Sequence, residues 1–169
     1  MRLFFAICLR ASTKLTTHLE RYAGRFDDAG YRMVPTVNLH MTLSFIGNAD
    51  AYVASQMLAR GAGVAAAPFI MTLGGPLMGL PNRHRPRVLA YGARDTGGLS
   101  QLVGQLDDLG RAGAFLPHVT VARAKGVVQR PVMPDLPIVE IPVNSFCLMN
   151  SQLGREGAVY SILKEFPLR

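Results

Sequence analysis

Two short apolar runs carry the same pair of polar residues, and they constrain this chain more than any other feature. The runs span residues 38–47 (NLHMTLSFIG) and 116–123 (LPHVTVAR). In an extended strand, successive side chains point to opposite faces, so His40 and Thr42 share one face, as do His118 and Thr120. Two such strands lying side by side would place two imidazoles and two hydroxyls around one small anion.

Each His-x-Thr run follows a strand-like segment and a helix-like segment. This order occurs over residues 3–9, 13–29 and 39–46, and again over 88–93, 98–110 and 117–122. The repetition predicts an internal duplication in which each half supplies one histidine. We therefore expect a single domain over residues 1–169 with an α+β fold. Its two pseudo-symmetric lobes would each have an antiparallel sheet covered by outer helices, with a cleft between them.

The remaining segments predict further elements of such a fold. A helix should begin near Asp50 and end near Gly61, and residues 68–80 read as a strand broken by a bulge at its glycines. Two final strands are expected over residues 138–149 and 159–166.

Composition restricts the partners more than it restricts the fold. The chain of 169 residues has 18 basic and 11 acidic side chains, a formal charge of +7, and 49% hydrophobic residues. This balance excludes a disordered chain and favours polyanionic partners such as RNA, DNA or nucleotides. No apolar run approaches the ~20 residues of a membrane span, and residues 3–9 read as a first strand rather than a leader. We expect a cytoplasmic monomer without a membrane partner.

The paired histidines suit acid–base chemistry at phosphorus. Imidazole titrates near pH 6.5, so one ring can remove a proton from water while the other protonates a departing sugar oxygen. The threonine hydroxyls can donate hydrogen bonds to the non-bridging phosphate oxygens. This scheme uses no metal and no other cofactor.

Two alternatives to this chemistry remain. The histidines could be ordinary strand residues, but two of the four histidines carry the pattern, whereas His18 and His84 lack it. A two-histidine zinc site would need a further ligand, and neither motif has a carboxylate or cysteine beside it. Cys8 and Cys147 each sit in an apolar run and read as small buried hydrophobes rather than a disulfide or a metal pair.

Further stretches extend the pattern over nearly the whole chain. They are residues 2–7 (RLFFAI), 38–47, 85–89 (RPRVL), 117–123 (PHVTVAR), 151–154 (SQLG) and Tyr160. Together they resemble the 2H phosphoesterase superfamily, in particular the RNA 2′,3′-cyclic phosphodiesterase family, also called the 2′-5′ RNA ligase family. The resemblance implies that RNA or oligonucleotide ends bearing a 2′,3′-cyclic phosphate are opened to a 2′-phosphomonoester, with reverse 2′-5′ ligation in some members. It also implies that His40 is the acid and His118 the base, although the symmetry of the motifs leaves that order open.

Two further residues enter through the resemblance. Arg123 resembles an arginine that contacts the phosphate, but strict alternation puts it on the face opposite His118, so it needs a twist or a bulge. Phe45 has the same five-residue offset from His40 and could stack on a base. Burial in the core is the alternative for Phe45.

Other features bear on the substrate rather than on the reaction. The basic loop Arg83, His84, Arg85 and Arg87 either guides an RNA backbone by its charge or is simply solvated. The chain has Ala90 where the family often has tryptophan, and Ser44 where a basic residue is common. The alternatives are therefore a related 2H enzyme for small cyclic nucleotides and a non-catalytic RNA-binding module that keeps the fold.

Overall fold

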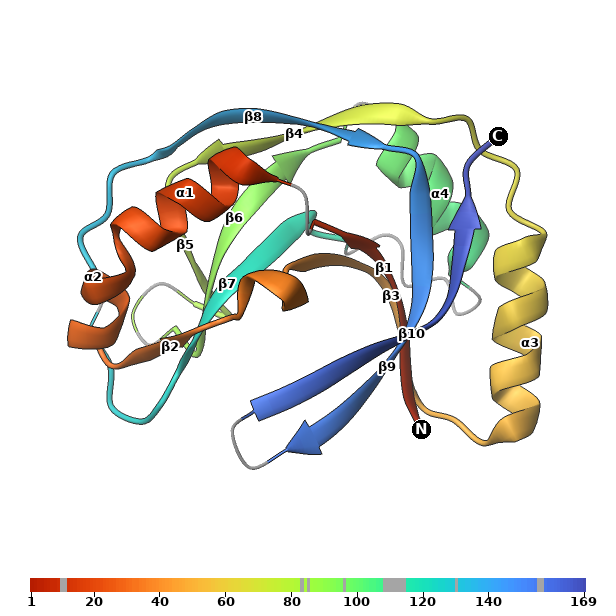
Figure 1. Ribbon diagram of the computed structural model, residues 1–169, viewed down its shortest axis with the longest axis horizontal. Coiled ribbons are helices and arrows are strands. Elements are labelled where there is room, and N and C mark those ends of the chain that lie inside the picture. Colours follow the sequence, from red (N-terminus) through yellow and green to blue (C-terminus); the bar gives the residue numbers. More distant parts are fainter. Residues whose placement is uncertain are drawn as a thin grey trace.

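The strands of this protein form two antiparallel sheets (Figure 1). The computed structural model describes residues 1–9, 12–82, 84, 86–95, 97–107, 115–129, 131–154 and 157–169. The four-stranded sheet has the order β10-β9-β1-β3. Its strands are β1 (Arg2–Cys8), β3 (His40–Asn48), β9 (Ser145–Gly154) and β10 (Gly157–Pro167).

The second sheet has six strands, five of them in the order β2-β7-β6-β4-β8, while β5 pairs with β6. These strands are β2 (Tyr31–Met33), β4 (Phe69–Gly75), β5 (Met78–Leu80), β6 (Val88–Arg94), β7 (His118–Ala124) and β8 (Leu136–Val143). The two sheets share a strand order, because β3-β1-β9-β10 in one corresponds to β7-β6-β4-β8 in the other. Strands β1 and β3 correspond to β6 and β7 in chain order, whereas β9 follows β1 and its counterpart β4 precedes β6. The duplication itself stays a prediction.

Helices cover the sheets, and they confirm the α+β class predicted from the sequence. They are α1 (Thr13–Arg21), α2 (Ala23–Asp28), the 3-10 helix η1 (Thr36–Asn38), α3 (Ala51–Ala62) and α4 (Gly98–Leu106). Helix α1 packs against β8, α3 against β9 and β10, and α4 against both β3 and β4. Among the described residues, no helix is long and apolar enough to cross a membrane.

Helix boundaries follow local chemistry, with two differences from the prediction. The Asp50 side chain accepts a hydrogen bond from the Val53 amide at 2.8 Å and caps α3, as expected. The predicted helix over residues 13–29 is instead two helices, because Tyr22 (φ −111°) leaves helical geometry between them. Helix α4 ends at Leu106, and residues 108–110 of the prediction lie outside the described residues.

The strand predictions agree with the structure except where the chain passes from one sheet to the other. A register shift between Leu73 and Gly75 confirms the bulge in residues 68–80, and the end of that segment is the separate strand β5. The single strand predicted over residues 138–149 is wrong. Val143 pairs with Phe69 in the six-stranded sheet, whereas Ser145 pairs with Pro167 in the four-stranded sheet. The chain changes sheets there, and the apolar pattern continues through the change without marking it.

Candidate active site

Both His-x-Thr pairs lie on the partly exposed face of their strands, opposite the face that enters the core. On β3, Met41 and Leu43 enter the core, while His40 and Thr42 keep some exposure. On β7, Val119 enters the core, while His118 and Thr120 keep some exposure. The alternation therefore places each imidazole beside its hydroxyl, as the sequence predicts. The two strands that carry the pairs, β3 and β7, are in contact with each other across the two sheets.

Small residues lie opposite both pairs in the neighbouring strands. Cys8 of β1 pairs with His40, and Ala6 pairs with Thr42. In the other sheet, Gly92 of β6 pairs with His118, and Ala90 pairs with Thr120. The two alanines thus occupy matching places opposite the two threonines. Ala90, which stands where the family often has tryptophan, is fully buried.

Both strands contain a bulge directly after the threonine. Along β3 the register passes from Thr42 to Ser44 and skips Leu43. Along β7 it passes from Thr120 to Ala122 and skips Val121. An extra residue reverses the alternation that follows it, so the fifth residue after each histidine returns to the face of that histidine.

The bulges bring Phe45 and Arg123 to the face of the two pairs. Phe45 lies opposite Phe4, and Arg123 lies opposite Val88. The bulge at Val121 therefore turns Arg123 to the face of His118, as its expected contact with the phosphate requires. The side chain of Phe45 is 45% exposed, so core burial, the alternative considered from the sequence, is wrong. The guanidinium of Arg2 lies 5.0 Å from the centre of the Phe45 ring, which orients that ring by a cation–π contact.

These side chains open into a cavity of about 420 Å³. It is lined by His40, Thr42 and Phe45 of β3, by Arg123 of β7, and by Arg2 and Phe4 of β1. The β9–β10 hairpin forms a further wall with Ser151, Leu153, Gly157, Ala158 and Tyr160. Figure 1 shows this hairpin projecting away from the rest of its sheet. His118 and Thr120 are not among the residues that line the cavity.

Each histidine is held in the same tautomer by the backbone just before its strand. Nδ1 of His40 lies 2.6 Å from the carbonyl oxygen of Asn38, and Nδ1 of His118 lies 2.7 Å from that of Leu116. A carbonyl oxygen can only accept, so Nδ1 donates and carries the proton. Nε2 of each neutral ring is then the nitrogen that can accept a proton. The two halves of the site thus share a hydrogen bond as well as a motif.

The surroundings of His40 shift the pKa of its imidazole. Burial lowers the pKa of His40 below its usual value near 6.5, and the positive charges of Arg123 and His118 lower it further. The hydrogen bond to the Asn38 carbonyl opposes this shift, because it favours the protonated ring. In the free protein at neutral pH, His40 is therefore mainly neutral. The influence of the His118 charge on His40 also shows that the two rings are electrostatic neighbours.

The basic loop considered from the sequence is described only in part. Arg83 and Arg85 lie outside the described residues, whereas His84 and Arg87 are exposed and do not line this cavity. No group of three or more His, Cys, Asp or Glu side chains that could hold a metal ion occurs within the described part of the chain. Sequence reasoning did not single out Arg2, Phe4 or Tyr160 as cavity residues, because nothing local in their segments links them to His40.

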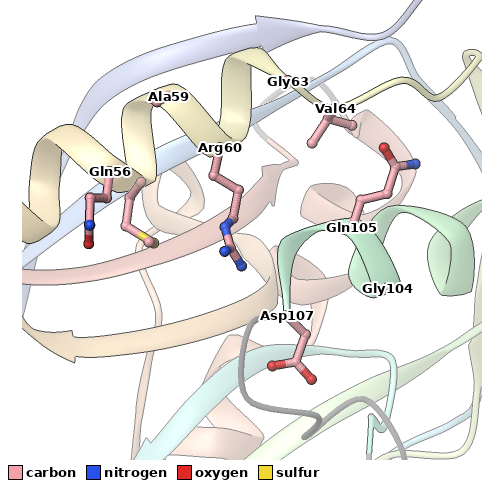
Figure 2. A pocket seen from close by; sticks show the side chains of 9 residues that line it. Gln56, Ala59, Arg60, Gly63, Val64, Gly104, Gln105 and Asp107 are labelled. Carbon is pink, nitrogen blue, oxygen red and sulfur yellow. The ribbon is translucent and has the colours of Figure 1, made fainter.

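A larger hollow of about 700 Å³ lies between α3 and α4, away from both motifs (Figure 2). The polar side chains around it join the two helices and the chain beside them. Gln105 accepts from the Ala65 amide at 2.8 Å and donates to the Ala65 carbonyl at 3.0 Å. Arg60 donates to the Leu106 carbonyl at 3.4 Å. We therefore assign this hollow to helix packing rather than to chemistry.

Comparison with known proteins agrees with this geometry. A family model described as LigT like phosphoesterase matches residues 10–90. An RNA 2′,3′-cyclic phosphodiesterase of Thermus thermophilus is 34% identical, and the match covers all of this chain and 91% of the relative. A crystal structure from Thermus thermophilus superposes with a TM-score of 0.85 at 32% identity, covering 100% of this chain and 98% of the other. The crystal structure of Escherichia coli LigT complexed with 3′-AMP superposes with a TM-score of 0.81 at 28% identity, covering 99% and 97%.

Proposed function

This chain belongs to the LigT-like family of 2H phosphoesterases, and from that premise we propose that it is an RNA 2′,3′-cyclic phosphodiesterase. Its substrate is an RNA or oligonucleotide end that carries a ribose 2′,3′-cyclic phosphate. The product is the 2′-phosphomonoester with a free 3′-hydroxyl. One observation carries the proposal: matching bulges bring Arg123 and Phe45 to the same face as the two His-Thr pairs.

The reaction needs one proton removed and one supplied. Water adds to phosphorus as the bond between phosphorus and the 3′-oxygen breaks, so the water loses a proton and the departing oxygen gains one. One histidine accepts the first proton at Nε2, and the other donates the second from its own Nε2. Thr42 and Thr120 donate hydrogen bonds to the non-bridging oxygens, where charge accumulates in the transition state. Arg123 offsets the negative charge of the phosphate from the side of β7.

The same step accounts for 2′-5′ ligation. If the 5′-hydroxyl of a second RNA takes the place of water, the 3′-oxygen still leaves and a 2′-5′ phosphodiester results. The proton transfers are unchanged, so no further catalytic group is required. Ligation would therefore depend on whether the site binds a second RNA end beside the first.

Family resemblance assigns the acid to His40 and the base to His118. An acid must be protonated before the reaction, whereas burial keeps His40 mainly neutral in the free protein. A phosphodiester carries one negative charge, and its arrival favours the protonated imidazole. In this assignment, His40 takes up a proton when the substrate binds and later donates it to the 3′-oxygen.

The proposal is tested with a short oligonucleotide that ends in a 2′,3′-cyclic phosphate, with a chelator present throughout. We expect turnover to a 2′-phosphate, distinguished from a 3′-phosphate by product analysis. Full activity of both His40→Ala and His118→Ala would contradict the mechanism. Tight, salt-sensitive RNA binding without turnover would indicate instead a non-catalytic RNA-binding module.

The size of the cavity favours a second candidate substrate, a small cyclic nucleotide. A volume of about 420 Å³ lies at the lower end of the range for small-molecule sites, and its lining offers one exposed ring for one base. Comparing kcat/KM for a 2′,3′-cyclic mononucleotide with kcat/KM for the oligonucleotide separates the two. An advantage for the oligonucleotide supports the RNA substrate.

A further inference from the structure

The imidazole of His40 is packed against two aromatic rings. The centre of the Tyr160 ring lies 4.9 Å from that of His40 at an interplanar angle of 70°, and the centre of the Phe4 ring lies 5.2 Å away at 40°. Phe4 and Tyr160 also contact each other edge to face, with 5.6 Å between their centres. Edge-to-face packing of this kind has a preferred geometry, so the three rings restrict one another.

This contact joins the two edges of one sheet. His40 is on β3 and Tyr160 is on β10, which stand at opposite ends of the order β10-β9-β1-β3. Adjacent strands are about 4.8 Å apart, so the edges of a flat sheet of this size would be separated by about 14 Å. A distance of 4.9 Å between ring centres therefore means that the two side chains reach toward each other across the sheet, and Phe4 of β1, between these edges, contacts both rings.

The other histidine has no such support among the described residues. His118 keeps the hydrogen bond from Nδ1 to the Leu116 carbonyl, but no aromatic ring contacts it there. The position that corresponds to Phe4 is Val88, because each lies opposite the fifth residue after the histidine. Only His40 is restrained from two further directions.

We propose that Tyr160 is a positioning residue for His40: together with Phe4, it holds the imidazole so that Nε2 faces the cavity. The inference rests on the proposed function for its chemical meaning, since His40 must deliver a proton to one oxygen. Phe4, His40 and Tyr160 all line the cavity, so the three packed rings form part of its wall. Other residues of the β9–β10 hairpin also line the cavity, so the hairpin that carries Tyr160 contacts both His40 and the substrate space.

Burial supports this role. The rings exclude water from one side of His40, and burial is the largest cause of its lowered pKa. Loss of the Tyr160 ring would admit water and let the pKa of His40 rise toward its ordinary value near 6.5. The same loss would allow the ring to turn, and misplacement of a catalytic group by about 1 Å can cost 10²-fold in rate.

The test compares Tyr160→Leu, which removes the ring, with Tyr160→Phe, which keeps it. The pKa of His40 is measured in the free protein by NMR titration of the imidazole signals, and His40→Gln identifies the His40 signal. We expect Tyr160→Leu to raise this pKa and to lower kcat by about 10-fold, with a smaller change in KM. Tyr160→Phe should restore the pKa and most of kcat. Tyr52→Leu, which removes an exposed tyrosine of α3, is the matched control.

Two results would overturn the inference. An unchanged pKa and kcat with a raised KM in Tyr160→Leu would show that Tyr160 only contacts the substrate. Equal losses in Tyr160→Phe and Tyr160→Leu would assign the effect to the hydroxyl rather than to the ring. Phe4→Leu approaches His40 from the other side and should repeat the shift, and a urea midpoint for each variant checks the fold. The NMR titration needs no turnover, so it stands even where the wild-type protein fails on cyclic phosphates.

Discussion

On the four-stranded sheet, the fifth residue after the histidine is Phe45, and on the six-stranded sheet the matching residue is Arg123. The backbone around them is alike, because both follow a bulge and both histidines bond the carbonyl two residues earlier. The side chains differ in kind. The half around His40 contributes three aromatic rings, those of Phe4, Phe45 and Tyr160, and its one guanidinium at the cavity, that of Arg2, lies against the Phe45 ring. The half around His118 contributes the guanidinium of Arg123 and no aromatic ring among the lining residues.

This difference shows how two similar halves can take unlike tasks. Both halves hold a histidine and a threonine at the same place on a bulged strand. An aromatic surface suits the flat face of a base, and a guanidinium suits the phosphate. We infer that the four-stranded sheet recognises the nucleoside and the six-stranded sheet recognises the charge. Burial among these aromatic rings is the largest cause of the lowered pKa of His40.

Removing the histidines should have the largest effect on kcat, and the loss should be similar for the two halves of the site. His40→Ala and His118→Ala are each expected to lower kcat by about 10²–10⁴-fold, because each deletes one proton transfer. The double variant should lose little more than either single variant, since the pair acts as a unit. Single-turnover rates on the cyclic-phosphate oligonucleotide measure this. His84→Ala is the control for kcat, and a double loss equal to the product of the single losses would contradict a coupled pair.

The threonines should give the next largest effect. Thr42→Val and Thr120→Val keep the shape but lose the hydroxyl, and each should lower kcat by about 10²-fold, as the loss of one oxyanion donor does. Thr42→Ser and Thr120→Ser retain the donor and should stay closer to the wild type. Steady-state kinetics with all four variants checks this. A similar loss in the serine and valine variants would mean that packing, rather than a hydrogen bond, explains the effect.

Exchanging the distinctive residue of each half should separate base recognition from charge recognition. Phe45→Ala should raise KM about 10-fold through lost stacking, more for purine than for pyrimidine ends, with little change in its salt dependence. Arg123→Ala should raise KM by about 10-fold for every base, and the difference should shrink as salt increases. KM across four terminal bases and several salt concentrations measures both effects.

Matched controls exist for both substitutions. Lys14→Ala removes one exposed positive charge on α1, and Tyr52→Ala removes one exposed ring on α3. Base-dependent effects of Arg123→Ala, or salt-dependent effects of Phe45→Ala, would break the division between an aromatic and a basic half.

The smallest expected effect is a shift between two pH profiles. As the acid, His40 must be protonated, so kcat/KM should fall as the pH rises through the lowered pKa of His40 in the free protein. The bound phosphodiester raises that pKa, so the corresponding fall in kcat should occur at higher pH. Profiles of both constants between pH 4 and 9 test this assignment. A kcat/KM that instead rises as the pH rises through the lowered pKa of His40 would favour His40 as the base.

Much of the site was accessible from the sequence because it depends on alternation within single strands. His40 and Thr42 share a face for a local reason, and the repeat of the pair near Pro117 pointed to the second half. The place of Arg123 was uncertain for an equally local reason, since alternation alone puts it on the wrong face. The bulge at Val121 decides its place, and a bulge is a property of two paired strands rather than of one.

Tertiary structure alone decided the contacts between distant segments. The change of sheet between Val143 and Ser145 is invisible in the apolar pattern, because each strand needs buried residues whichever sheet it joins. Likewise, no signal near Tyr160 places its ring against His40, since that contact joins the two edge strands of a sheet. The sequence by itself determined the faces of the strands and the chemistry they present. Pairing and curvature, which depend on partners far away in the chain, decided which side chains meet.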